Sequence, residues 1–195
     1  MSAKYSKTTA DFLSWDQNLN LIRKLFNDKK FEISLFVAVG SFWGLRASDI
    51  LKLKWVDILG KNDFVLIEKK TGKRREIKIN PQLKQHIKEC YDSIRPESDG
   101  QPIFLSQKNT TYSIQRLNAI FKNIKTKYNL NVTNFSTHSM RKTFGRQVFN
   151  KAGTNAEMAL VKLSQLFNHS SVIVTRRYLG ITRDELLQTY DALTF

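Results

Sequence analysis

The chain has 195 residues, 41% of them hydrophobic, which suffices to bury one substantial core or two small ones. Its 32 Lys and Arg residues outnumber 17 Asp and Glu residues, and the formal net charge of +15 favours a polyanionic partner, with nucleic acid ahead of an acidic membrane surface. The single cysteine, Cys90, excludes an intramolecular disulfide and a zinc site built on cysteines. Residues 1–10 lack the apolar core of a signal peptide, and no window has the apolar length of a membrane span, so we expect a soluble intracellular protein.

Periodic apolar residues predict a mainly helical chain. In chain order, the expected elements are helices at 12–27, 31–42 and 49–55, a β-hairpin with strands near 64–67 and 76–79, and helices at 81–93, 113–128, 140–149 and 156–167. The hairpin has a basic tip, and the apolar helix at 31–42 is expected to be buried and to end at Gly44. Thr182, with Glu185 three residues later, predicts the N-cap of a last helix over 182–195.

These elements predict an α+β fold that is mainly α with a small antiparallel β-hairpin or sheet. We expect one domain over 1–195, with residues 1–10 flexible, because the chain has no low-complexity linker and no internal repeat.

Three short patterns combine arginine, histidine and tyrosine residues. They are GLRASDI at 44–50, THSMRKTF at 137–144, and LFNHSS at 166–171 with Arg177 and Tyr178 after it. Together, and in this order, they resemble the catalytic domain of the tyrosine recombinase, or phage integrase, family from about Phe12 to the C-terminus. Each pattern alone is weak, but the three rarely occur together.

The chemistry of DNA cleavage explains why such residues would be combined. Cutting DNA without a metal requires a nucleophile, positive charge around the phosphate, and a proton donor for the departing sugar oxygen. Arg46 and Arg141 can offer forked N–H donors to the phosphate, His138 lies three residues before Arg141 on the same helix face, and His169 can donate another hydrogen bond. The Tyr178 hydroxyl can attack in line and form a phosphotyrosyl bond that conserves the energy of the broken linkage, so no ATP is needed.

The family resemblance implies further roles. It implies that Tyr178 becomes joined to the 3′ phosphate, that His138 is the general base, and that Lys70 at the hairpin tip donates a proton to the leaving 5′ oxygen. Lys69 and Lys73 are close alternatives to Lys70. No cofactor and no metal are expected.

Each of these residues also has an ordinary explanation. Tyr178 alone could be a packing residue, the two histidines alone could be structural, Arg46 could pair with Asp49, and Lys70 could be a solvated hairpin tip. Only the ordered combination outweighs these explanations. The resemblance makes Asp49 a structural carboxylate that orients its neighbours, and His86 matches no motif and is expected at the surface.

Two departures from the family pattern stand out. Asn168 occupies a position that is usually Gly, although Asn also tolerates the left-handed conformation that a helix end needs. The family usually has a helical core-binding domain before the catalytic one, but almost nothing precedes Phe12. We therefore expect no core-binding domain in this chain, which would be a separated catalytic domain or a natural short form.

The expected function is site-specific DNA recombination that integrates, excises or inverts a mobile element. The expected partners are duplex DNA and other copies of the protein in a tetrameric synapse, with 182–195 as a docking element, in the cytoplasm and nucleoid of a prokaryotic cell. The alternatives are a noncatalytic DNA-binding regulator and a type IB topoisomerase.

Overall fold

The computed structural model describes residues 10–182, 184 and 190. The chain divides into two compact units, Met1–Thr143 (unit 1) and Phe144–Phe195 (unit 2), and the boundary falls inside helix α7 (Thr137–Lys151). Each unit has its own buried hydrophobic cluster. The single domain expected over 1–195 stays a prediction, and the expectations for 1–10 and for a helix over 182–195 fall almost entirely outside the described residues.

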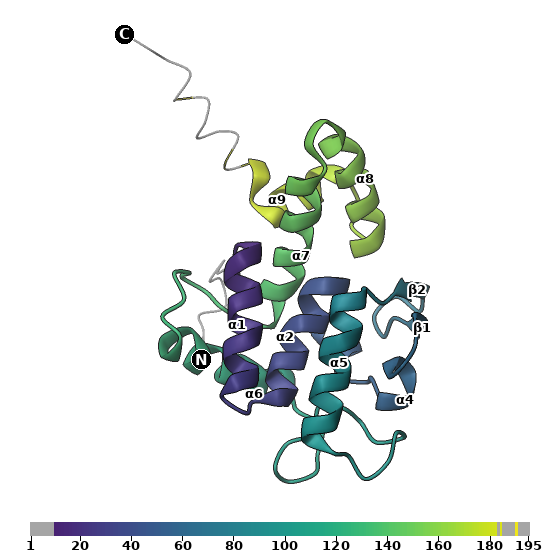
Figure 1. The fold of residues 1–195 in the computed structure, drawn as a ribbon. Coiled ribbons are helices and arrows are strands. Elements are labelled where there is room, and N and C mark those ends of the chain that lie inside the picture. Colours follow the sequence, from purple (N-terminus) through teal and green to yellow (C-terminus); the bar gives the residue numbers. More distant parts are fainter. Residues whose placement is uncertain (1–9, 183, 185–189, 191–195) are drawn as a thin grey trace. The chain divides into compact units, whose positions relative to one another are not determined.

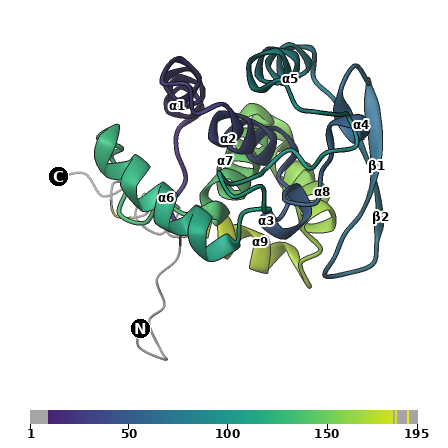
Figure 2. The same cartoon turned by 90° about the horizontal axis from the view of Figure 1, so that it is seen from below.

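A row of three helices forms one side of unit 1. Helix α2 (Phe31–Trp43) lies between α1 (Trp15–Asn27) and α5 (Pro81–Ile94), as both views of the ribbon show (Figures 1 and 2). Because α2 is covered by its neighbours, most of its side chains are buried, which confirms the buried helix predicted there. Helix α1 begins later than predicted because Ser14 and Gln17 form a capping box in front of Trp15.

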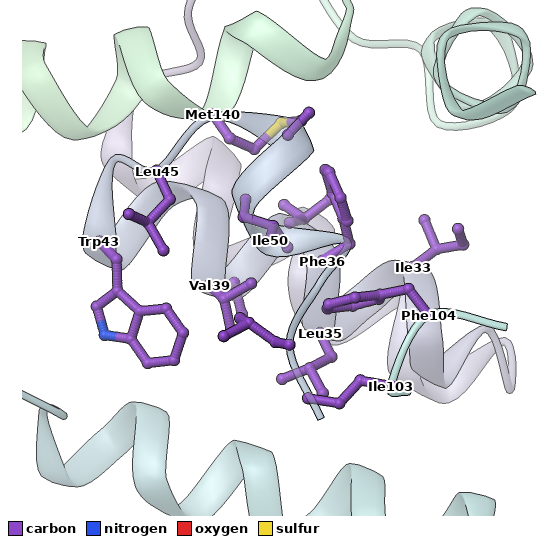
Figure 3. Close-up of a cluster of buried hydrophobic side chains, with 14 of the residues drawn as sticks. Ile33, Leu35, Phe36, Val39, Trp43, Leu45, Ile50, Ile103, Phe104 and Met140 are labelled. Carbon is purple, nitrogen blue, oxygen red and sulfur yellow. The ribbon is translucent and has the colours of Figure 1, made fainter. Parts of the chain in front are cut away.

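The core of unit 1 gathers around α2. Figure 3 shows Phe36, Val39 and Trp43 of α2 packed with residues from other parts of the unit. The other residues of this cluster that the figure labels are Ile33, Leu35, Leu45, Ile50, Ile103, Phe104 and Met140. This cluster fixes the C-terminal end of α2, where Gly44 adopts a left-handed conformation with φ of 58°.

The helix predicted over 49–55 is wrong in its extent. The structure has two short helices instead, α3 (Ala47–Ile50) and α4 (Trp55–Ile58). Between them the Leu53 carbonyl accepts a hydrogen bond from the backbone N–H of Ile103 at 3.0 Å, and Lys54 forms a β-bridge with Pro102. The helix is interrupted because this backbone pairs with a distant loop.

The β-hairpin and the later helices of unit 1 follow the prediction closely. Strands β1 (Asp63–Ile67) and β2 (Arg74–Lys78) are antiparallel, with Val65 opposite Glu76, and a turn rich in lysine joins them. Helix α6 (Ile114–Lys127) is capped by Ser113, whose hydroxyl accepts the Arg116 N–H. The fold expected, mainly α with a small antiparallel hairpin, is therefore observed.

Unit 2 contains the C-terminal part of α7, the 3₁₀ turn η1 (Gly153–Asn155), α8 (Ala156–Phe167) and α9 (Val172–Leu179). Helix α8 has the predicted bounds, whereas α7 begins three residues earlier than predicted. Helix α9 was not predicted. Its first residues are β-branched and disfavour helix, but Ser171 caps it and its buried Thr175 and Leu179 anchor it.

Within the part of the chain that the structure describes, no helix combines the length and apolar character needed to cross a membrane.

Candidate active site

The turn after α2 organises two arginines of unit 1. The last carbonyl groups of a helix have no partner inside the helix, so they attract cationic donors. Here Arg141 Nη1 donates to the Gly44 carbonyl at 2.5 Å, and Arg75 Nη2 donates to the Trp43 carbonyl at 2.6 Å. Two residues after Gly44, Arg46 has an extended backbone and precedes α3. The GLR motif and the His-x-x-Arg motif are therefore brought to the same turn.

Two carboxylates of unit 1 join this turn to the hairpin. Arg46 Nη1 donates to Glu68 Oε2 at 2.6 Å, and Asp49 Oδ1 accepts the backbone N–H of Lys69 at 2.8 Å. Asp49 is fully buried, and its carboxylate fixes the backbone at the start of the hairpin turn. The expected role of Asp49 in orienting neighbouring side chains stays a prediction.

His138 and Arg141 lie one turn apart near the start of α7. The start of this helix is fixed by Asn118, whose side-chain oxygen accepts the Thr137 N–H at 3.0 Å. Arg141 is buried, whereas His138 is exposed. Partial desolvation and the positive charge of Arg141 lower the pKa of His138 below its ordinary value. Its imidazole is therefore neutral near pH 7, which is the form that accepts a proton.

The hairpin lysines are all at the surface of the turn. Lys69, Lys70 and Lys73 are exposed, and Lys70 lies between Lys69 and Thr71, whose contacts fix the turn. All three lysines are accessible to a bound DNA molecule. Their exposure therefore does not show which of them is the proton donor. The assignment of Lys70 stays a prediction.

His169 and Tyr178 come together in unit 2. Asn168 caps the C-terminus of helix α8 and adopts the left-handed conformation with φ of 52°, which its residue type was expected to tolerate. The next residue, His169, has its ring 5.2 Å from the Tyr178 ring in an edge-to-face arrangement, and Phe167 lies 5.7 Å from Tyr178 on α9. His169 Nδ1 lies 3.0 Å from the Thr175 hydroxyl oxygen.

The predicted site residues thus fall into two groups. Arg46, Lys70, His138 and Arg141 belong to unit 1, and His169 and Tyr178 belong to unit 2. Within its own unit, each group has defined hydrogen bonds and ring contacts. The catalytic roles of all six stay predictions.

Sequence comparison decides the family. The model of the family described as "Phage integrase family" matches residues 13–185. The chain belongs to the phage integrase family. This confirms the resemblance to tyrosine recombinases, and the enzyme class is that of a site-specific recombinase.

Relatives of this integrase family chain cover most of its length. The "Probable integrase/recombinase YoeC" of Bacillus subtilis (strain 168) is 32% identical over 166 residues, which cover 85% of this chain and 86% of YoeC. The tyrosine recombinase XerC of Lactobacillus leichmannii is 23% identical over 193 residues, which cover 94% of this chain and 63% of XerC. The chain thus spans somewhat less than two thirds of the XerC length.

Solved structures show the same fold. The XerA recombinase has a TM-score of 0.70 and 18% identity, over all of this chain and 68% of XerA. The XerH recombinase bound to palindromic difH substrate, in a post-cleavage complex, has a TM-score of 0.69 and 16% identity, over 95% of this chain and 54% of XerH. The integrase catalytic-domain fold expected from the sequence is confirmed.

Sequence reasoning missed three residues at or beside the predicted site. Glu68 contacts Arg46 and Thr175 contacts His169, whereas Arg75 contacts Glu68 and the Trp43 carbonyl. Glu68 follows β1 in the same alternation as the buried Phe64 and Leu66, and a charged residue at such a position is a signal that we did not use. Arg75 likewise alternates with the buried Ile77 of β2. Thr175 had no usable signal, because α9 itself was not predicted.

The expectation for His86 is wrong. Its side chain is only 15% exposed, with Nε2 3.0 Å from the Ser34 hydroxyl and its ring 5.6 Å from the Phe26 ring. Burial lowers the pKa of His86, although the charge of Glu89 opposes this shift. It is a packing residue between α1, α2 and α5.

Proposed function

We propose that this integrase family protein cuts DNA at specific sites and rejoins it through a covalent 3′-phosphotyrosyl bond at Tyr178, without metal or ATP. The observation that carries the proposal is the joint anchoring of Arg46 and Arg141 around the Gly44 turn. Two guanidinium groups held in this way form a prepared site for a phosphate. The structural neighbours solved with DNA, such as XerH on difH substrate, support duplex DNA as the partner.

The proposed reaction begins with attack of the Tyr178 oxygen on the scissile phosphorus. The phenolic proton passes to neutral His138, Arg46 and Arg141 hold the nonbridging oxygens, and His169 donates a further hydrogen bond. The bond from phosphorus to the 5′ oxygen breaks, and Lys70 protonates that oxygen. A 5′ hydroxyl of another strand then attacks the phosphotyrosyl bond and releases Tyr178, so the number of phosphodiester bonds is conserved.

Strand exchange between two duplexes requires four cleavages, so we propose a tetrameric synapse on DNA. The segment 182–195 is proposed to dock on a second copy, because its sequence contains Leu186, Leu187 and Leu193. A groove of about 650 Å³ on unit 2, lined in part by Val148, Met158 and Ala159, offers an apolar surface for such a segment. The protein would act in the cytoplasm of a prokaryotic cell, on the DNA of the nucleoid.

Trapping of a covalent adduct tests the nucleophile. In a pool of short duplexes with randomised sequence and nicks at varied positions, cleavage close to a nick releases a short leaving fragment, so adducts accumulate. We expect adducts on denaturing gels with the wild-type protein and none with Tyr178→Phe, which keeps the ring contacts with Phe167 and His169. Sequencing of the trapped DNA would give the site.

Tyr91→Phe is the matched control, because Tyr91 belongs to α5 and is neither a predicted site residue nor part of the segment proposed to dock. It should form adducts as the wild type does. Sequence-specific binding by the wild-type protein without any adduct would instead establish a noncatalytic regulator. Relaxation of a supercoiled plasmid without paired sites would establish a topoisomerase.

A further inference from the structure

Glu68 is a buried carboxylate at the end of strand β1. Only 4% of its surface is exposed, because it continues the inward-facing alternation of Phe64 and Leu66. A buried carboxylate is costly unless charged or polar partners surround it. The groups that contact Glu68 therefore indicate its structural role.

Three side chains surround the Glu68 carboxylate. Oε2 accepts from Arg46 Nη1 at 2.6 Å and from the Thr71 hydroxyl at 2.8 Å, and Oε1 lies 3.9 Å from Arg75 Nη1. Burial by itself raises the pKa of Glu68, but the hydrogen bonds from Thr71 and Arg46 and the charges of Arg46 and Arg141 outweigh burial and lower the pKa. Glu68 is therefore an anion near pH 7.

The surroundings hold Glu68 in one place. Its backbone N–H donates to the Lys73 carbonyl at 3.0 Å, and its carbonyl accepts the Gly72 N–H at 2.9 Å, so the residue belongs to the closed hairpin turn. The Thr71 hydroxyl fixes the carboxylate within the same turn. A rigid acceptor of this kind orients a long, flexible arginine side chain far better than water does.

We infer that Glu68 is a positioning residue that orients the Arg46 guanidinium for the scissile phosphate. This inference rests on the proposed function, in which Arg46 contacts the phosphate. A guanidinium has five N–H donors, so a bond from Nη1 to Glu68 fixes the plane of the group without using its whole capacity for hydrogen bonds. Small errors in the placement of such a group slow a reaction strongly.

Glu68→Gln tests the inference, because Gln keeps the shape of Glu and loses the charge. We expect single-turnover formation of the Tyr178 adduct on the trapped nicked duplex to slow by about 10- to 100-fold, while DNA affinity changes little. Glu76→Gln is the matched control, since Glu76 is an exposed glutamate of the same hairpin, and it should react as the wild type does. Thr71→Val keeps the charge and loosens Glu68, so it should slow the reaction in the same direction by a smaller factor.

A double-mutant cycle separates positioning from a general role in folding. Arg46→Lys keeps the positive charge but lacks the fork, so Glu68→Gln should add almost no further slowing to it. Multiplicative effects of the two changes would overturn the inference. So would tighter DNA binding and faster cleavage by Glu68→Gln, which would make Glu68 a competitor of the phosphate.

The proposed function and this inference fail in different ways. Absence of any adduct from the wild-type protein overturns the proposed function and the inference with it. A wild-type adduct that depends on Tyr178 and forms equally fast in Glu68→Gln overturns the inference alone.

Discussion

The hydroxyl group of Thr175 contacts a predicted site residue, His169. Thr175 is fully buried in α9, and its oxygen lies 3.0 Å from His169 Nδ1 and 3.3 Å from the Ser171 carbonyl oxygen. A hydrogen bond at one imidazole nitrogen fixes the ring orientation and thus the direction of the other nitrogen. In the proposed reaction that other nitrogen, Nε2, donates to the phosphate, so the Thr175 hydroxyl gives its proton to Nδ1 in that state and not to the Ser171 carbonyl.

Thr175→Val should therefore slow adduct formation by about tenfold or more, equivalent to roughly 1.4 kcal/mol of transition-state stabilisation. Valine has nearly the shape of threonine, so the helix should persist, and single-turnover trapping measures the effect. Thr175→Ser keeps the hydroxyl and should retain most of the rate. If Thr175→Val reacts as fast as the wild type, the hydroxyl does not orient His169.

The type of a residue predicted its backbone conformation, but it did not predict which distant side chain or backbone group the residue contacts. Asn168 was expected to tolerate a left-handed conformation and has one, because this property depends on the residue itself. Asp49 was considered as a partner of Arg46, but Asp49 Oδ1 accepts the Lys69 backbone N–H, whereas Arg46 Nη1 donates to Glu68. Side-chain partners that are 20 or more residues away in sequence depend on how the hairpin meets α3.

The helices of unit 2 pack closely around Gly145 of α7. A Cβ atom there would lie 2.5 Å from Leu179 Cδ2 and 3.1 Å from the Phe167 ring. Helix propensity favours Gly145→Ala by up to about 1 kcal/mol, whereas overpacking costs about 1–3 kcal/mol. We expect the clash to prevail, so that Gly145→Ala lowers the free energy of unfolding measured by urea denaturation.

Gly100→Ala provides the control for Gly145→Ala. The nearest neighbour of a Cβ atom at Gly100 is the Ser98 hydroxyl at 3.9 Å, and the change should be neutral or slightly stabilising. A Gly145→Ala protein more stable than the wild type would mean that Leu179 and Phe167 yield easily. In that case α9, which carries Tyr178, is not held by close packing at this point.

The bounds of helices were predicted correctly where they depend on neighbouring residues in the sequence. The bounds of α8 and α6 follow from apolar periodicity and from capping by residues such as Ser113. The helix expected over 49–55 was broken by pairing of Leu53 with Ile103, and α9 formed despite its β-branched start. In both places, tertiary contacts overrode the local preference.

The net charge of +15 makes a prediction for the molecule as a whole. Binding to random duplex DNA should weaken steeply with salt, by about 10³-fold or more between 50 and 200 mM if six or more phosphates are contacted. Fluorescence anisotropy at several salt concentrations measures the slope of log K against log salt. Arg46→Gln should make that slope less steep by the amount that corresponds to about one phosphate contact, whereas Tyr178→Phe should leave the slope unchanged. Binding that is insensitive to salt would show that the basic residues do not face DNA.

The sequence by itself determined the mainly helical fold, the basic hairpin, the family and the set of residues expected to act on a phosphate. These properties depend on residue type, local periodicity and the order of short motifs, which can be read along the chain. Only the tertiary structure decided that the Gly44 carbonyl holds Arg141, that Glu68 holds Arg46, and that Thr175 meets His169. These contacts depend on long-range packing, in which each buried polar group must find its partner wherever the fold brings one.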